Sequence, residues 1–227
     1  MNGCEFELVG QQLIALASGA LLQPGAGVLC VSDLHLGKSD RIARRTGSLL
    51  PPYENIETLG RLADVIDATG ARTIICLGDS FDDLDGVDAL DPDCQDLLTR
   101  CQAGRRWIWI EGNHDPGPVG LGGTHRTAFT IDGLTYRHIA DPGAEAEISG
   151  HYHPKMRIPG GGGARKCLVY DRFRCILPPF GTYTGGLNVS DPAIASLLSA
   201  PAFAVLTGRK AIRAPVPLAH TKRVKAS

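Results

Sequence analysis

The stretch Trp107-Ile108-Trp109-Ile110-Glu111-Gly112-Asn113-His114-Asp115 decides the fold, because a buried strand ends there in a cluster of polar side chains. Aromatic and β-branched residues fill its first part, which is typical of a buried strand. Gly112 then lets the backbone turn sharply and present an amide, an imidazole and a carboxylate on one loop. Such strand-to-loop junctions are where α/β enzymes usually carry their functional residues.

Four more strand-like runs end in side chains of the same kind. The polar residues at these ends are Asp33 and His35 after 28–32, Asp79 after 73–77, His138 at the end of 134–138, and His151 and His153 after 146–149. Asp33 and His35 are two residues apart, as are His151 and His153, so in an extended segment each pair shares one face. His125 is an alternative to His138, because both fall at the open end of the hairpin predicted around Asp132-Gly133. Only His138 ends a strand as the other candidates do.

These donors predict a two-metal site. Asp33, His35, Asp79, Asn113, His138, His151 and His153 offer oxygen and imidazole ligands, which suit manganese, iron or zinc. Seven ligands are too many for one tetrahedral ion. They suit two ions about 3.5–4 Å apart that share a carboxylate, the arrangement used in phosphoryl and acyl hydrolysis.

The composition predicts one soluble domain over residues 1–219 and a basic, disordered tail over 220–227. The net charge is −1 and the pI is about 6.6, so binding to a polyanion requires a local basic patch. The 7 cysteines are scattered without a C-x-x-C motif, which argues against a disulfide framework and favours the cytoplasm. Because there is no signal peptide and no 18-residue apolar run, we expect neither export nor a membrane span.

The helical periodicity of 54–69, closed by Gly70, predicts a helix that packs and does no chemistry. Asp91-Pro92 is typical of the start of a second helix, which we expect to run to about Cys101. A short helix is expected near 193–198, and strands are expected within 5–16 and over 168–170, 175–177 and 203–206.

In this order, Asp-x-His, Gly-Asp, Gly-Asn-His-Asp, a lone histidine and Gly-His-x-His resemble the motifs of the calcineurin-like metallophosphoesterase superfamily. The resemblance implies an α/β fold in which two packed, mixed β-sheets are flanked by helices. It also implies that Asp33, His35 and His153 hold one metal, that Asn113, His138 and His151 hold the other, and that Asp79 bridges them. His114 would then protonate the leaving oxygen, oriented by Asp115, after a bridging hydroxide attacks phosphorus.

A narrower resemblance covers nearly the whole chain. The stretches 34–39, 44–53, 77–81, 147–151 and 177–188 are similar to bacterial metallophosphoesterases associated with an ATP-dependent DNA ligase and a DEXH-box helicase. That family implies a manganese-dependent DNA nuclease or end-processing phosphodiesterase of repair, with the ligase and the helicase as partners. Two departures concern substrate handling: Asp82 stands where a histidine is expected, and Gly160–Gly163 loosens a loop that is usually more basic.

Basic residues follow two of the motifs. If Asp40 opens a helix, Arg41, Arg44 and Arg45 share one face and, with Lys38, are candidates to bind backbone phosphates. Arg157, Arg165 and Lys166 raise the same possibility on the opposite rim. For each group the alternative is an ordinary solvated surface.

The sequence therefore predicts metal-dependent hydrolysis of phosphodiester bonds, with DNA as the expected substrate. A phosphomonoesterase, or a phosphodiesterase acting on small cyclic or dinucleotides, is the alternative, because the same site chemistry serves both. An inactive scaffold would be expected to show damage among the ligands or at His114, and there is none.

Overall fold

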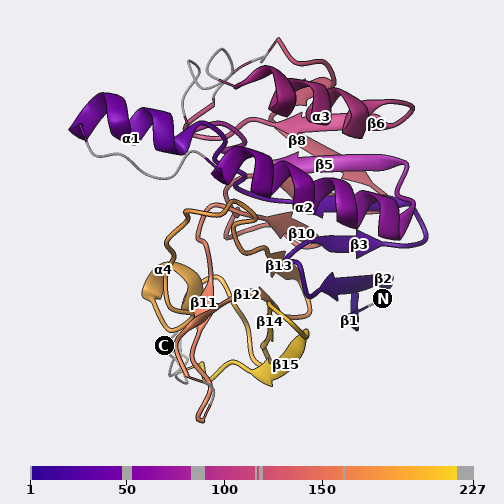
Figure 1. Cartoon of the computed structure of the whole chain (residues 1–227). Helices are drawn as coiled ribbons and strands as arrows, with labels where there is room; N and C mark the ends of the chain where they lie inside the picture. The colour runs from indigo at the N-terminus through magenta and orange to yellow at the C-terminus, as the bar shows by residue number, and fades with distance from the viewer. Residues whose placement is uncertain are drawn as a thin grey trace.

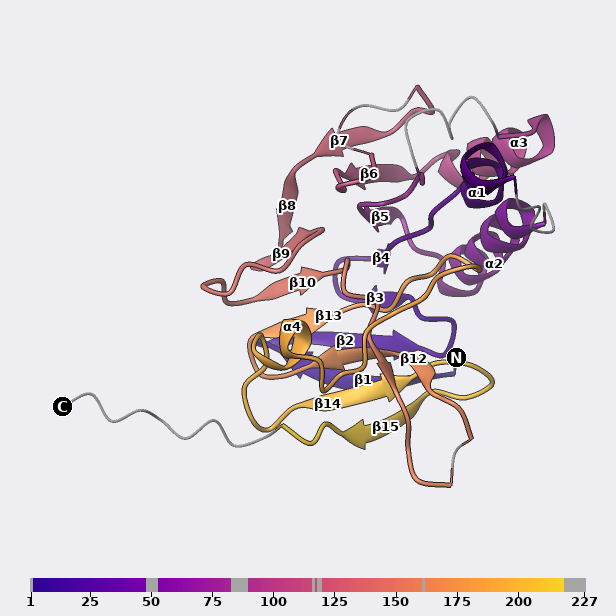
Figure 2. The ribbon, with the colours of Figure 1, turned by 90° about the vertical axis from the view of Figure 1, so that its left-hand side faces the viewer.

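Two mixed β-sheets packed face to face form the centre of the molecule (Figures 1 and 2). The structure is a computed structural model that describes residues 2–47, 53–82, 90–115, 117, 120–160 and 162–218. The tail predicted over 220–227 lies outside these ranges.

The first sheet has seven strands in chain order. They are β1 (Gly3–Leu8), β2 (Gln11–Leu16), β3 (Leu21–Gln23), β4 (Val28–Val31), β5 (Thr73–Leu77), β6 (Arg106–Ile110) and β7 (Thr124–Arg126). Strands β1 to β4 pair antiparallel, whereas β4 to β7 pair parallel. The parallel part needs crossover connections, which helices supply between β4 and β6.

The second sheet runs in the order β15 (Ile212–Pro215), β14 (Phe203–Leu206), β12 (Arg165–Tyr170), β13 (Arg174–Ile176), β10 (Glu147–Ser149), β9 (Leu134–Arg137) and β8 (Ala128–Ile131), with β11 (Lys155–Met156) paired to β12. Strand β10 is parallel to both of its neighbours, and the remaining pairs are antiparallel. The sequence patterns did not predict β7, β11 or β15, which are short or largely exposed and so lack a clear apolar period.

Helices complete the layers. They are α1 (Lys38–Thr46), α2 (Glu54–Thr69), α3 (Pro92–Gln102) and α4 (Pro192–Ala195). One core lies between α2, α3 and the first sheet, a second lies between the two sheets, and a third lies between the second sheet and α4. The predicted fold class, two packed mixed sheets flanked by helices, is confirmed.

The helices form for the reasons that the sequence indicated. In α2, Leu59, Leu62 and Ile66 are at most 1% exposed, and the helix ends at Gly70 with a φ of 61°. In α3, the Asp91 carboxylate caps the helix by accepting a hydrogen bond from the Cys94 N–H at 2.9 Å. Helix α1 begins at Lys38, two residues before the predicted start, and only Ser39 of its residues is buried. Figure 1 shows α1 extending away from the body of the protein.

The sheet topology brings the polar strand ends together. Because β4, β5 and β6 are parallel neighbours, their carboxyl ends lie at one edge of the first sheet. The second sheet supplies the ends of β9 and β10, which are also parallel to each other. The Gly150 N–H donates to the His138 carbonyl at 2.9 Å, which joins these two ends.

Candidate metal centre

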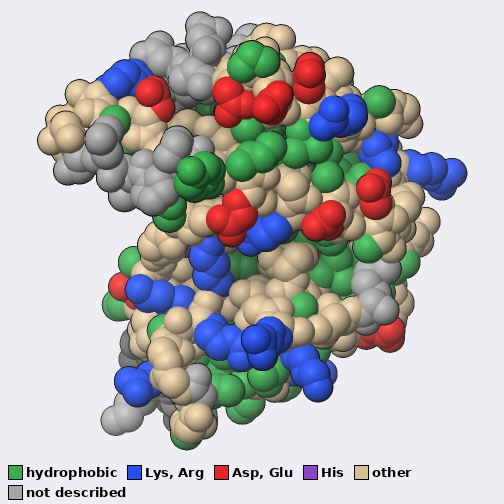
Figure 3. Space-filling view, viewed as in Figure 1, with side chains coloured by type: hydrophobic (Ala, Val, Ile, Leu, Met, Phe, Trp, Pro, Cys, Tyr) green, Lys and Arg blue, Asp and Glu red, His purple; other side chains and the backbone are tan. Residues whose placement is uncertain are grey.

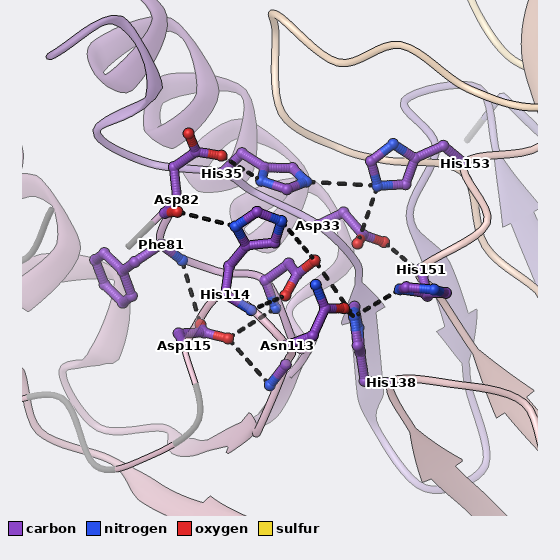
Figure 4. Close-up of polar contacts among 12 residues, drawn as sticks. Asp33, His35, Phe81, Asp82, Asn113, His114, Asp115, His138, His151 and His153 are labelled. Atoms are coloured by element: carbon purple, nitrogen blue, oxygen red, sulfur yellow. Dashed lines mark hydrogen bonds and ion pairs between the residues drawn. The ribbon is translucent and has the colours of Figure 1, made fainter. Parts of the chain in front are cut away.

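The seven predicted metal ligands meet at the edge that the two sheets share (Figure 4). The first sheet presents Asp33 and His35 after β4, Asp79 after β5 and Asn113 after β6, whereas the second presents His138 after β9 and His151 and His153 after β10. Among the described residues, the donors fall into two groups, Asp33–His35–His153 and Asp79–His138–His151.

In the first group, His153 lies between its partners. Its Nε2 is 3.0 Å from Oδ1 of Asp33 and 3.5 Å from Nε2 of His35. One carboxylate oxygen and two ring nitrogens therefore face a common point.

In the second group, Nε2 of His138 is the central atom. It is 3.4 Å from Oδ2 of Asp79, 3.2 Å from Nδ1 of His151 and 3.0 Å from Oδ1 of Asn113. Asn113 thus joins this group, as the family resemblance implies.

The donor chemistry fits a cation. Nδ1 of His138 donates to the Leu77 carbonyl at 2.8 Å, so in its neutral form the ring has a lone pair at Nε2. That lone pair faces the carboxylate oxygen of Asp79 and the amide oxygen of Asn113. Three lone pairs directed at one point repel each other unless a cation or a proton lies between them.

The electrostatics keep the two carboxylates ionised. Burial alone would raise the pKa of Asp79, but its hydrogen bond to His138 and the nearby charge of that ring lower the pKa below the ordinary value. For Asp33, burial is likewise outweighed by the hydrogen bond to His153, and its pKa is lowered. Burial and the charge of His138 lower the pKa of His151, which favours the neutral imidazole that a metal requires.

The backbone is strained at these residues. Asp33, His35, Asp79, His151 and His153 all have positive φ values, between 45° and 69°, which is uncommon outside glycine. Each such residue costs on the order of 1–3 kcal/mol and persists only where surrounding contacts enforce it. The loops are therefore shaped to aim donors inward.

Gly78 and Gly150 allow the close approach of the two sheets. A Cβ on Gly78 would lie 2.5 Å from the His138 ring, and one on Gly150 would lie 1.7 Å from Oγ of Ser32. Any larger side chain at either position would push the second sheet away from the first.

His114 faces the site without belonging to either donor group. Its Nδ1 donates to the Asp82 carbonyl at 3.0 Å, and its Nε2 lies 4.0 Å from Oδ2 of Asp79. The His114 N–H also donates to Oδ1 of Asp79 at 2.9 Å, which fixes the loop. The ring therefore presents Nε2 to the centre, in position to transfer a proton.

The prediction that Asp115 orients His114 is wrong. The Asp115 carboxylate accepts backbone N–H groups instead, from Asp79 at 2.9 Å, Ser80 at 2.8 Å, Phe81 at 3.2 Å and Gly112 at 3.0 Å. The turn at Gly112 directs this side chain back toward the loop after β5 and away from the imidazole. Burial raises the pKa of Asp115 to about 6, against the hydrogen bonds from Phe81 and Ser80 that lower it.

Asp82 is a site residue that the sequence analysis placed outside the ligand set. Its Oδ1 lies 2.8 Å from Nδ1 of His35, and its other oxygen pairs with the Arg41 guanidinium. A carboxylate that accepts the Nδ1 proton leaves Nε2 of His35 free for a metal. The sequence did mark Asp82, because it stands where a histidine is expected. Its contact with His35 could not be predicted, because the two residues are 47 positions apart in the chain.

The predicted substrate-binding residues do not form one continuous surface. Arg41 is 20% exposed and paired with Asp82, and Nε of Arg44 pairs with Asp40 at 2.9 Å; Lys38 and Arg45 are the other two basic residues of α1. Arg165 donates to the Thr207 carbonyl at 2.8 Å, so its guanidinium holds a loop in place. Arg157 lines a pocket beside β11 and β15 that contains none of the metal-ligand candidates.

His125, the alternative to His138, lies on β7 with its ring stacked on Trp109 at 6.4 Å between centroids. It is in neither of the donor groups found in the described part of the chain. The structure therefore places His138 with the other candidates.

Comparison with known proteins identifies the family. The calcineurin-like phosphoesterase family matches residues 27–146. The chain belongs to this family. It is therefore a metal-dependent phosphoesterase of a family that uses two metals, and the paired donor groups are consistent with that requirement.

A solved structure, described as the Pseudomonas putida nuclease MPE, is similar to this phosphoesterase with a TM-score of 0.73 and 25% sequence identity, over 95% of this chain and 100% of the other. A comparison with curated proteins gives no match. Within the described residues, no helix is long and apolar enough to cross a membrane.

Proposed function

We propose that this phosphoesterase cleaves phosphodiester bonds in DNA, with strand ends in repair as its substrate. The observation that carries the proposal is the pair of donor groups with Nε2 of His114 beside them. The similarity to a protein described as a nuclease, over nearly the full length of both chains, supports a polynucleotide substrate.

In this proposal, Asp33, His35 and His153 would hold one divalent cation, Asn113, His138 and His151 would hold the other, and Asp79 would be shared between them. The mixed oxygen and imidazole donors fit manganese, with iron or zinc as alternatives. The two cations, when bound, supply an activated water and offset the negative charge that develops on the phosphoryl oxygens.

The chain supplies the proton for the leaving group. In its protonated form, His114 donates from Nδ1 to the Asp82 carbonyl and presents its second proton, on Nε2, to the site. Oδ2 of Asp79 lies 4.0 Å from this Nε2. Proton transfer from a positioned imidazole to the departing oxygen contributes about 10²–10⁴-fold to such reactions.

The decisive experiment uses end-labelled single-stranded, nicked and overhang-bearing DNA with added manganese or a chelator. We expect manganese-dependent cutting that falls by roughly 10²–10⁴-fold in the His114→Ala variant. His125→Ala is the matched control, because it removes a histidine that lies outside the two donor groups. Absence of cutting by the wild-type protein on every DNA substrate would exclude the nuclease.

One observation favours a smaller substrate. Arg41 pairs with Asp82 and Arg44 with Asp40, which reduces the positive charge that α1 offers to a long polyanion. Bis(p-nitrophenyl) phosphate and small cyclic and dinucleotides are therefore tested alongside DNA. Hydrolysis of these compounds without cleavage of DNA would favour a small-nucleotide phosphodiesterase, and hydrolysis of monoesters alone would favour a phosphomonoesterase.

A further inference from the structure

A pocket of about 270 Å³ is lined by residues that include none of the donors of the metal centre. Two cationic side chains line it, Arg61 of α2 and Lys166 of β12, together with backbone from the loops at 17–19, 178–179 and 207–208. Helix α2 covers the first sheet and β12 belongs to the second, so the pocket is built across both. Figure 3 shows Lys and Arg side chains gathered below α2, where the surface is hollowed.

Arg61 is held in place by uncharged groups. Its guanidinium donates to the Phe180 carbonyl and lies 4.8 Å from the centroid of the Phe180 ring. Its Nε is buried and has no hydrogen-bond partner. Glu57, one turn earlier on α2, offsets part of the charge without forming an ion pair within the described chain.

Lys166 is also held by carbonyls. Its Nζ donates to Pro179 O at 3.1 Å and to Gly181 O at 2.7 Å, which leaves one of its three protons available. Burial, and then the charges of Arg61 and Lys38, lower the pKa of Lys166 to about 8. Over the described residues neither Arg61 nor Lys166 forms an ion pair with a carboxylate, so two cations face one pocket without an anion between them.

The pocket is connected to the metal centre through one short segment. The N–H groups of Phe180 and Gly181 donate to the carbonyls of Ser32 at 2.7 Å and Asp33 at 3.1 Å, so the segment that carries the acceptors of Lys166 lies directly against the Asp33 loop. A Cβ on Gly181 would lie 2.2 Å from the Leu34 carbonyl, and only glycine allows this contact. Segment 179–181 therefore contacts both Lys166 and the loop that carries Asp33.

We infer that the Arg61–Lys166 pocket is an anion subsite that binds a backbone phosphate of the nucleic acid strand beside the bond being cleaved. The inference rests on the proposed function, because it assigns the pocket to the same substrate. Two cations with unused donors and no anionic partner provide charge-assisted hydrogen bonds to a phosphodiester.

The test measures binding without cleavage. A fluorescein-labelled single-stranded oligodeoxynucleotide is titrated with metal-chelated protein at several salt concentrations, and its anisotropy reports the affinity. The proteins are the wild type, R61Q, K166Q, the double variant R61Q/K166Q and the charge-retaining pair R61K/K166R. R100Q is the matched control, because Arg100 is an exposed arginine in the last turn of α3.

We expect the double variant to bind the strand roughly tenfold more weakly, with a slope of log K against log[salt] that is shallower by about 0.7 for each charge removed. The pair R61K/K166R retains most of the affinity, and R100Q behaves as the wild type. Unchanged affinity and slope in R61Q/K166Q would overturn the inference. So would an equal loss in R61K/K166R, because the two residues would then act through packing.

Calorimetry with inorganic phosphate separates a strand phosphate from a free one. If phosphate binding depends on Arg61 and Lys166 while strand affinity does not, the pocket is a free-anion site and the assignment to the strand is wrong. Because these measurements require no catalysis, a wild-type protein that fails to cut DNA with manganese contradicts the nuclease and not the binding result.

Discussion

The two sheets contribute differently to the metal centre. The first sheet supplies mainly oxygen donors, from Asp33, Asp79 and Asn113, whereas the second supplies three imidazoles. The first-sheet carboxylates are fixed by backbone N–H groups, since Asp79 accepts from His114 at 2.9 Å and Asp33 accepts from His151 at 3.0 Å.

The second-sheet imidazoles depend on the first sheet for their orientation. His138 is set by the Leu77 carbonyl of β5, and the backbone of His151 is held by the Asp33 carboxylate. Both donor groups draw on both sheets, so neither sheet provides a complete site. The centre is therefore a joint between the sheets, and it requires their correct packing.

The largest effect on stability is expected from Asp115, whose carboxylate holds together the loops that follow β5 and β6 of the first sheet. Asp115→Ala leaves the buried N–H groups of Asp79, Ser80 and Phe81, and the partly buried one of Gly112, without an acceptor. Because each such group costs about 1–3 kcal/mol, the free energy of unfolding should fall by roughly 4 kcal/mol. Urea denaturation measures the change, with the exposed Asp96→Ala as control. A loss below 1 kcal/mol would show that the first-sheet loops do not need the clamp.

The second prediction tests whether metal bound at the centre stabilises the packing of the two sheets. Metal that binds only the folded protein stabilises it by about 2.7 kcal/mol at one hundred times Kd, so chelation should lower Tm by roughly 5–10 °C. His153→Ala should reduce this difference because it removes a second-sheet donor, whereas His125→Ala should retain it. Differential scanning calorimetry with manganese and with a chelator provides the measurement. An identical Tm with manganese and with the chelator would contradict stabilisation of the two sheets by bound metal.

The third prediction separates the two donor groups. Among the metal-ligand candidates, the Asp82 carboxylate is hydrogen-bonded to His35, in the Asp33 group, so Asp82→Asn should weaken metal binding at that group about 10–100-fold and spare the Asp79 group. Manganese titration by calorimetry should then show one weakened binding event of two. Asp132→Asn, in the turn between β8 and β9, is the control. Equal weakening of both binding events would mean that Asp82 stabilises both donor groups and does not act through His35 alone.

The smallest effect is expected on strand binding at the Arg61–Lys166 pocket, which, like the metal centre, draws residues from both layers of the fold. A lysine is charged below its pKa, so with a pKa of about 8 Lys166 loses its charge as the pH rises from 7 to 9. Its charged neighbours are Arg61, Lys38, Asp33 and Glu57. In metal-chelated protein, strand affinity should fall a few-fold over this interval in the wild type and less in Lys166→Arg, because arginine stays charged. An equal pH dependence in both proteins would remove Lys166 from the strand site.

Local patterns in the sequence were sufficient to predict most of the elements and the candidate ligands. An apolar run that ends in Asp-x-His, Gly-Asp or Gly-His-x-His predicts both the strand and the donors after it, because adjacent residues determine both. The helix at 54–69 and the Asp91 cap were predictable for the same reason.

The tertiary structure alone decided which partner each polar side chain has. Asp115 contacts the loop after β5 and not the adjacent His114, Asp82 pairs with His35, and His138 rather than His125 faces Asp79. Arg61 and Lys166 line one pocket only because the tertiary structure brings α2 and β12 together. Hydrogen bonds and ion pairs depend on distance in space, and the packing of two sheets sets distances that no short stretch of sequence encodes.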